Sequence, residues 1–239
     1  MTGSGSAARD SGGPLAAVFL DGDYGDPGWH NALAKRADVV LAADGGARFL
    51  IGLSLMPDAV VGDFDSLGAA DQARLRAAGV ELLRHPVRKD VTDGELAVDE
   101  ALRRGAGEIL LAGATGALDH TLGHLAILRR LAARGVAARI VAPRLTATVL
   151  VSPAAVALDA VAGTRVSLVP MAGDVTVTLS GFEYPLDRGV LPADVCLGIG
   201  NHVTGPGEAR IVLHEGVAAV LVECGGVVFR PLDAPRAAR

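Results

Sequence analysis

Residues 59–66 read Ala-Val-Val-Gly-Asp-Phe-Asp-Ser, a short apolar run that ends in two acidic residues, Asp63 and Asp65. Similar short runs alternate with longer segments in which apolar residues recur at three- and four-residue spacing. The runs are 16–20, 39–43, 59–62, 81–85, 109–112 and 139–142, and the longer segments include 69–78, 94–104 and 122–134. This alternation predicts βαβ units and a mostly parallel sheet.

The pattern changes after Pro143. Strand-like runs now follow one another without helical segments between them, at 146–151, 165–170, 175–179, 195–199, 209–214 and 217–222. Glycine-containing turns separate several of them, which is typical of an all-β sandwich. We therefore expect an α/β fold with an N-terminal, mostly parallel α/β domain (14–144) followed by a C-terminal all-β sandwich domain (145–234). A Gly- and Ser-rich tail at 1–13 is expected to be disordered.

Composition and charge exclude several classes of protein. The formal net charge of −5 gives no basic surface for nucleic acid, so no nucleic-acid partner is expected. No apolar run approaches the ~20 residues of a membrane span, and residues 1–13 lack the features of a signal peptide. We expect a cytoplasmic protein without membrane contact. Cys196 and Cys224 are flanked by apolar residues and are expected to be reduced, buried thiols.

Acidic motifs follow four of the predicted parallel strands. They are Asp44-Gly45-Gly46, Asp63-Phe64-Asp65-Ser66, Lys89-Asp90-Val91-Thr92-Asp93 and Asp119-His120. The carboxyl ends of parallel strands meet at one edge of a sheet, where ligands bind, so these motifs should converge. Side chains two residues apart in an extended chain point to the same side, so Asp63 and Asp65 can hold one cation. Mg²⁺ is the ion that such oxygen ligands favour.

Each motif also has a purely structural interpretation. A single Asp at a strand-to-helix turn is often a helix N-cap, and Thr92-x-x-Glu95 has the spacing of a capping box. Gly45 and Gly46 would let backbone amides approach a phosphate at a helix N-terminus. His120 and His124 have metal-ligand spacing, but without a third soft ligand nearby a satisfied or substrate-facing pair is favoured over zinc.

In these motifs and in their order the chain resembles the thiamine pyrophosphokinase family. The specific part is Gly62-Asp63-Phe64-Asp65-Ser66 followed by Lys89-Asp90-x-Thr92-Asp93. The match continues through Gly113-Ala114-Thr115-Gly116 before Asp119-His120. In the β-rich half it includes Gly181-Phe182-Glu183-Tyr184-Pro185-Leu186 and Gly198-Ile199-Gly200-Asn201. The likeness therefore covers nearly the whole chain after the tail.

The resemblance implies transfer of pyrophosphate from ATP to the hydroxyl of thiamine, with release of AMP. It also implies a homodimer with thiamine between the subunits, where the β-sandwich contributes to thiamine binding and dimerisation. The implied metal ligands for Mg²⁺ are Asp63, Asp65 and Asp90, and Asp119 completes the implied catalytic set. The implied nucleotide and substrate contacts are Asp44, Gly45, Gly46, Ser66, Lys89, Thr92, Asp93, His120, Gly200 and Asn201.

Three departures from the family pattern concern the substrates: the first removes a phosphate contact, and the other two lie near the acceptor in the family. The turn Gly116-Ala117-Leu118-Asp119-His120 is one residue shorter than usual and lacks its arginine, His124 stands where the family has Asn, and Gly200 replaces a Ser. Two alternatives therefore stay open. One is a pyrophosphokinase that acts on another heterocyclic alcohol, such as a hydroxymethylpterin. The other is a non-catalytic regulator that binds a nucleotide or thiamine.

Overall fold

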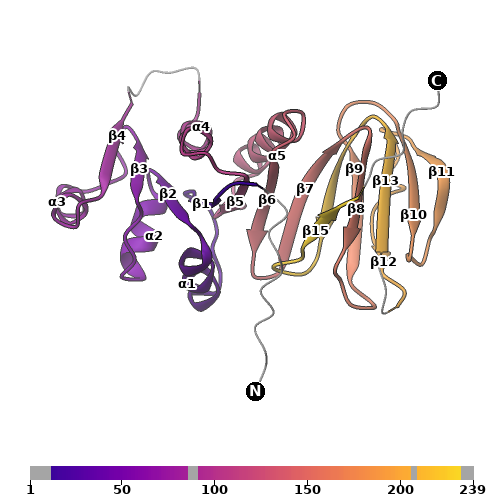
Figure 1. Cartoon of the computed structure of the whole chain (residues 1–239), viewed down its shortest axis with the longest axis horizontal. Helices are drawn as coiled ribbons and strands as arrows, with labels where there is room; N and C mark the ends of the chain where they lie inside the picture. Colours follow the sequence, from indigo (N-terminus) through magenta and orange to yellow (C-terminus); the bar gives the residue numbers. More distant parts are fainter. Residues whose placement is uncertain (1–11, 86–90, 206–208, 233–239) are drawn as a thin grey trace.

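The chain forms an α/β half and a β-rich half that share one long sheet (Figure 1). The computed structural model describes residues 12–85, 91–205 and 209–232. The shared sheet has the strand order β12-β9-β14-β7-β6-β5-β1-β2-β3-β4. These strands are β1 (Leu15–Phe19), β2 (Val39–Ala43), β3 (Ala59–Gly62), β4 (Glu81–Arg84), β5 (Glu108–Ala112), β6 (Ala137–Ala142), β7 (Leu145–Val151), β9 (Arg165–Pro170), β12 (Asn201–His202) and β14 (Val217–Val222).

The part of this sheet from β6 to β4 is parallel, as the sequence predicts. β1 lies in its middle. The chain moves outward through β2, β3 and β4 on one side of β1, whereas β5 and β6 lie on the other side. Such a reversal of strand order opens a crevice at the carboxyl ends of the two strands where it occurs, here β1 and β5.

Helices cover both faces of the parallel strands. They are α1 (Pro27–Arg36), α2 (Gly46–Gly52), α3 (Ala69–Ala77), α4 (Asp93–Arg103) and α5 (Leu118–Ala132). Figure 1 shows α4 and α5 on one side of the sheet and α1 and α2 on the other. Successive side chains of a strand point to opposite faces, so Val18 joins the core beneath α4 and α5, and Phe19 joins the core with α1, α2 and α3.

The β-rich half is the predicted sandwich. Its second sheet has the order β11-β10-β13-β8-β15 and is antiparallel. The strands are β8 (Ala154–Leu158), β10 (Val175–Ser180), β11 (Leu186–Leu191), β13 (Ala209–Glu215) and β15 (Phe229–Pro231). Val166 and Val220 of the long sheet share one buried core with Val177 and Ile211 of the second sheet. The two sheets therefore pack face to face.

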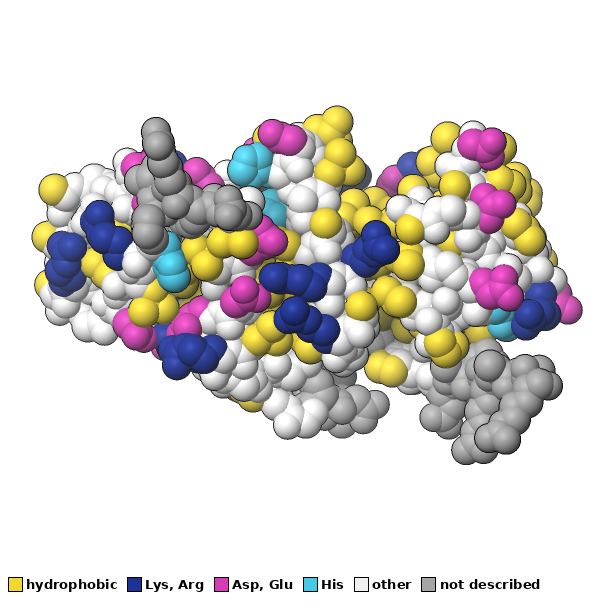
Figure 2. All heavy atoms as spheres, turned by 90° about the horizontal axis from the view of Figure 1, so that it is seen from above, with side chains coloured by type: hydrophobic (Ala, Val, Ile, Leu, Met, Phe, Trp, Pro, Cys, Tyr) yellow, Lys and Arg dark blue, Asp and Glu magenta, His cyan; other side chains and the backbone are white. Residues whose placement is uncertain are grey.

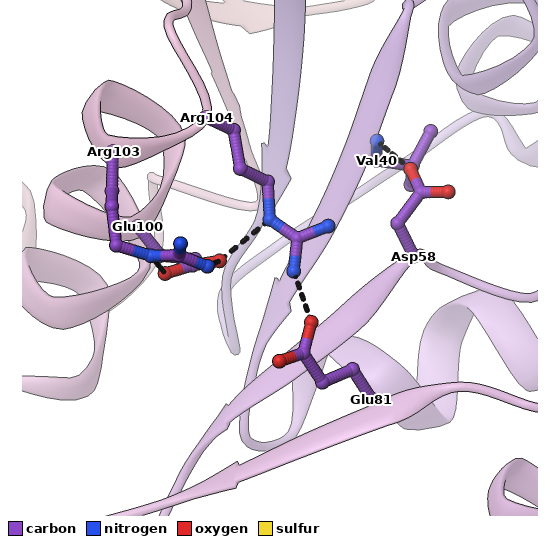
Figure 3. Close-up of polar contacts among 6 residues, drawn as sticks. All are labelled: Val40, Asp58, Glu81, Glu100, Arg103 and Arg104. Carbon is purple, nitrogen blue, oxygen red and sulfur yellow. Dashed lines mark hydrogen bonds and ion pairs between the residues drawn. The ribbon is translucent and has the colours of Figure 1, made fainter.

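An ion-pair network around the buried Glu100 fixes the C-terminal end of α4 to the sheet (Figure 3). Glu100 is 8% exposed and accepts hydrogen bonds from Arg103 and Arg104, each at 2.6 Å. Arg104 also donates to Glu81, the first residue of β4. The hydrogen bond from Arg103 is the largest cause that lowers the pKa of Glu100. The network holds α4 at the amino end of β4, which leaves the helix N-terminus at the carboxyl edge.

Two local predictions were wrong. Residues 195–199 are not a strand but form turns, with β12 starting at Asn201. Their alternate apolar residues, Val195, Leu197 and Ile199, are about half exposed or more, so no buried face supports a strand. Both cysteines are exposed and free rather than buried. Cys196 lies in this turn segment and Cys224 follows the end of β14.

The predicted N-terminal tail and the expected absence of a membrane span concern the ends of the chain and its helices. The tail predicted at 1–13 lies outside them except for Gly12 and Gly13. Within the described ranges, no helix combines the length and the apolar character that a membrane crossing requires.

Candidate functional site

A cleft of about 870 Å³ opens at the carboxyl edge of the parallel sheet. Leu20 and Gly22, which follow β1, and Gly113 and Thr115, which follow β5, contribute to its wall. The cleft therefore lies where the strand order reverses, at the expected ligand site of such a sheet. Of the predicted site residues, those that line it are Asp44, Asp63, Thr92, Asp93, Asp119 and His120.

Three carboxylates meet beside this cleft. Asp44, Asp63 and Asp65 each offer an oxygen that lies within 4.8 Å of the oxygens of the other two. Asp63 and Asp65 converge through a tight turn and not through extended chain, so the predicted local geometry was wrong. The backbone N–H of Asp65 donates to Oδ1 of Asp63 at 3.0 Å, and Phe64 between them has a φ of +66°. The Phe64 side chain is 4% exposed in the core, which holds this rarely populated conformation.

The surroundings of Asp44 disfavour its charged form. Its pKa is raised, chiefly by burial and then by the negative charges of Asp93, Asp63 and Asp65. The hydroxyl of Ser66 donates to Oδ2 of Asp44 and acts in the opposite direction. Oδ1 of Asp44 is buried and has no hydrogen-bond partner among the described residues. An unpaired buried carboxylate oxygen is costly, and a cation is the partner that would satisfy it.

The chemistry of this cluster suits a hard divalent cation. It offers carboxylate oxygens from two strand ends, and one of them accepts no hydrogen bond from the residues that the structure describes. Mg²⁺ binds through one or two carboxylates and keeps further positions for water and phosphate oxygens. Asp90, the third predicted metal ligand, and Lys89 lie outside the described residues.

The N-terminus of α4 borders the cluster. Thr92 caps the helix: its hydroxyl accepts from the N–H of Glu95 at 3.2 Å, and the Glu95 carboxylate accepts from the N–H of Thr92 at 3.0 Å. The predicted capping box is therefore confirmed. Asp93 lies close to Asp44, since a Cβ added at Gly62 would sit 3.2–3.3 Å from atoms of both.

The first two turns of α5 bring Asp119, His120 and His124 to the cleft. Oδ1 of Asp119 accepts from the backbone N–H of His120 at 2.8 Å. The two imidazole rings lie 6.3 Å apart between centroids. Nδ1 of His124 lies 2.8 Å from the carbonyl oxygen of Ala114. The pKa of His124 is lowered, first by burial, with a smaller contribution from His120.

Close packing explains why residues 45 and 46 are glycines, which the sequence alone did not reveal. A Cβ at Gly45 would lie 2.2 Å from the Asp21 carboxylate, and one at Gly46 would lie 2.1 Å from the carbonyl oxygen of Phe19. Neither glycine lines the cleft, whereas Asp21 does. Asp21 also pairs with Arg48 at 3.4 Å. The sequence pattern could have identified Asp21 as a site residue, because Asp21 follows the first apolar run just as the other acids follow theirs.

Arg130 is a second cleft residue that the sequence did not indicate. It lies on α5, lines the cleft and pairs with Asp99 of α4 at 3.1 Å. Among the described lining residues it is the one Lys or Arg side chain, in a cleft with several carboxylates. Figure 2 looks onto the molecule from above and shows Asp, Glu and His side chains on the half that carries α4 and α5.

Gly200 and Asn201 are not brought to the cleft within one chain. Asn201 lies in β12, at the edge of the long sheet, and its side-chain amide bonds the backbone N–H and carbonyl of Tyr184 at 3.0 and 2.9 Å. The N–H of Gly200 donates to the hydroxyl of Ser167 at 3.1 Å. The strands β9, β14, β7 and β6 lie between β12 and the cleft strands.

Known proteins resemble the chain over both halves. The family model for the thiamin pyrophosphokinase catalytic domain matches residues 30–140, and the model for the thiamin pyrophosphokinase vitamin B1 binding domain matches residues 155–218. A thiamine pyrophosphokinase from Bacillus subtilis (strain 168) is 28% identical over 165 residues, which are 68% of this chain and 77% of that protein.

Solved structures agree with this fold. A thiamine pyrophosphokinase structure from Bacillus subtilis superposes with a TM-score of 0.76 at 22% identity, covering 88% of this chain and 99% of that one. A thiamin pyrophosphokinase structure from Geobacillus thermodenitrificans has a TM-score of 0.74 at 27% identity and covers 89% and 98%. Together with the two family models, which match consecutive parts of the sequence, these findings show that the chain belongs to the thiamin pyrophosphokinase family.

Proposed function

We propose that the chain is a thiamine pyrophosphokinase that transfers the pyrophosphoryl group of Mg²⁺-bound ATP to the hydroxyl of thiamine, giving thiamine diphosphate and AMP. One observation carries the proposal most directly: in a member of this family, a carboxylate cluster borders the cleft at the reversal of strand order, and one buried oxygen of Asp44 has no hydrogen-bond partner in the described part of the chain. Such a cluster suits phosphoryl-type transfer, because that reaction depends on positioning the reactants and neutralising the phosphate charge more than on covalent chemistry.

The proposed metal ligands are Asp63, Asp65 and Asp90, with Asp44 beside them. A Mg²⁺ ion held there would neutralise the phosphate charge that develops during transfer. Ser66 fixes the orientation of Asp44 through its hydrogen bond. The N-termini of α4 and α5 both border the cleft, and their dipoles favour anions there.

Most of the remaining predicted residues are assigned to the substrates. We assign the phosphates of ATP to Lys89 and Thr92, and the acceptor side to the first turn of α5. Asp119 and His120 line the cleft in that turn, and Asp93 lines it at the start of α4. Gly45 and Gly46, which do not line the cleft, are assigned to the close packing at the start of α2 instead.

We further propose a cytoplasmic homodimer in which the β-rich half (145–234) of one chain faces the α/β half (14–144) of the other. Gly200 and Asn201 then reach the thiamine site of the partner chain, since they lie far from the cleft of their own. Exposed apolar side chains in the β-rich half support an interface there, among them Tyr184, Leu197 and Ile199. Light scattering over a tenfold range of concentration tests this, and a fully active monomer would contradict it.

The activity is tested by giving the purified chain Mg²⁺-ATP with thiamine, with a hydroxymethylpterin, or with no acceptor, and separating the nucleotides and products by chromatography. We expect AMP and thiamine diphosphate in the thiamine reaction. AMP formed only with the pterin would reassign the acceptor, and nucleotide binding without AMP in any reaction would support the non-catalytic alternative.

A further inference from the structure

We propose that His124 is the proton acceptor for the alcohol that attacks ATP, an inference that rests on the proposed function. The residue belongs to α5 and lines the cleft one helical turn beyond His120. In the family pattern this position holds an Asn, whose amide has no basic nitrogen, so the role belongs to this chain's own sequence.

The hydrogen bond to Ala114 fixes which ring nitrogen is free. A carbonyl oxygen can only accept, so at 2.8 Å Nδ1 of His124 carries the hydrogen and donates. In a neutral imidazole the other nitrogen, Nε2, then has an unshared electron pair. Burial and the neighbouring His120 lower the pKa of His124, which keeps the ring in this neutral, basic form near pH 7.

The free nitrogen points toward the start of α4. A Cβ added at Gly94 would lie 3.7 Å from Nε2 of His124, which is an ordinary van der Waals distance, so this nitrogen lies beside the first turn of α4. Gly94 follows Asp93, which lies close to Asp44 of the carboxylate cluster. His124, Asp44 and Asp63 line the same cleft. A hydroxyl that attacks a phosphate held at the cluster would therefore enter the cleft that His124 borders, as a general base requires.

The proposed step is balanced in atoms and charge. The acceptor hydroxyl gives its proton to Nε2 of His124 as its oxygen forms a bond to the β-phosphorus of ATP. The bond between that phosphorus and the α,β-bridging oxygen breaks, and the electron pair leaves on AMP. The imidazolium then releases the proton to water, which restores the neutral ring.

Two variants and one remote control test the step. His124→Asn keeps a donor for the Ala114 carbonyl but has no basic nitrogen, and His124→Ala leaves space for a small molecule. His214→Ala is the matched control, because His214 contacts Thr178 and Arg188 in the β-rich half, away from the cleft. We expect kcat to fall about 100-fold or more in both His124 variants, with KM for ATP close to wild type. The melting temperature should stay close to wild type in His124→Asn and fall in His124→Ala, which loses the hydrogen bond to Ala114. The control should keep wild-type kcat.

Chemical rescue separates proton transfer from cavity filling. Added imidazole should restore turnover of His124→Ala, whereas pyrazole, of similar shape but far weaker basicity, should not. Unchanged kcat in His124→Asn, or equal rescue by both molecules, would overturn the inference while wild-type formation of thiamine diphosphate leaves the proposed function standing. If wild type uses another alcohol, the same comparison is made with that acceptor. Wild type that transfers to no alcohol overturns both proposals.

Discussion

Replacing Asp63 with Asn isolates the charge of one proposed metal ligand from its structural role. Oδ1 of Asp63 accepts the hydrogen bond from the Asp65 N–H that closes the turn. The side-chain oxygen of Asn can accept the same bond, so the turn and the buried Phe64 should stay in place. The variant therefore deletes a negative charge at the cluster with little change in shape.

The expected loss of Mg²⁺ affinity can be estimated by comparison with groups that only orient a metal ligand. Altering a group that only orients a metal ligand costs 10–100-fold in metal affinity, so loss of a ligand charge should cost about 100-fold or more, or ~2.7 kcal/mol. Without Mg²⁺ the variant should be at least as stable as wild type, because Asp63 repels Asp44 and contributes to its raised pKa. Asp63→Ala also removes the turn hydrogen bond and should lose a further ~1 kcal/mol of unfolding free energy.

The assay is AMP formation against Mg²⁺ concentration, together with thermal unfolding with and without Mg²⁺. We expect Asp63→Asn to need at least about 100-fold more Mg²⁺ for half-maximal rate and to lose the stabilisation by Mg²⁺ that wild type shows. Near-wild-type turnover of Asp63→Asn at limiting Mg²⁺ would refute the assignment of this residue as a metal ligand.

Two further predictions concern the frame around the cleft. Gly46→Ala should destabilise the fold by about 3 kcal/mol, since its Cβ would meet the carbonyl oxygen of Phe19 at 2.1 Å, whereas Gly52→Ala at the end of the same helix has open space and should be neutral or slightly stabilising in urea unfolding. Glu100→Gln should cost about 2 kcal/mol at pH 7. The pKa of Glu100 is lowered in the folded chain from its ordinary 4.5, so its contribution is present above pH 4.5 and disappears as the pH falls through the folded value. The difference in unfolding free energy between wild type and Glu100→Gln should therefore vanish in acid, and a constant difference would contradict this.

The parallel strands could be predicted because each is a short apolar run followed by a helical period, as at 59–62 and 69–78. The convergence of Asp44, Asp63 and Asp65 followed from topology, since strand ends of one parallel sheet share an edge. The turn that joins Asp63 and Asp65 could not be predicted from the sequence, because the left-handed backbone of Phe64 is set by burial of its ring against residues distant in sequence.

The β-rich half was harder to predict in detail. β11 contains Asp187, Arg188 and Gly189 at the edge of its sheet, and Arg188 has a φ of +49°, so no apolar alternation marks it. The apolar periodicity also does not predict that the two halves share one long sheet. The continuity of this sheet depends on the pairing of Val141 with Thr146 across a short hairpin between β6 and β7.

The measurement that tests the central claim most directly is ³¹P NMR of the products formed from Mg²⁺-ATP and thiamine. Pyrophosphoryl transfer at this site predicts AMP and thiamine diphosphate in equal amounts, with no product in the absence of either thiamine or Mg²⁺. Formation of ADP or inorganic phosphate in place of AMP, or of AMP without phosphorylated thiamine, would contradict the account.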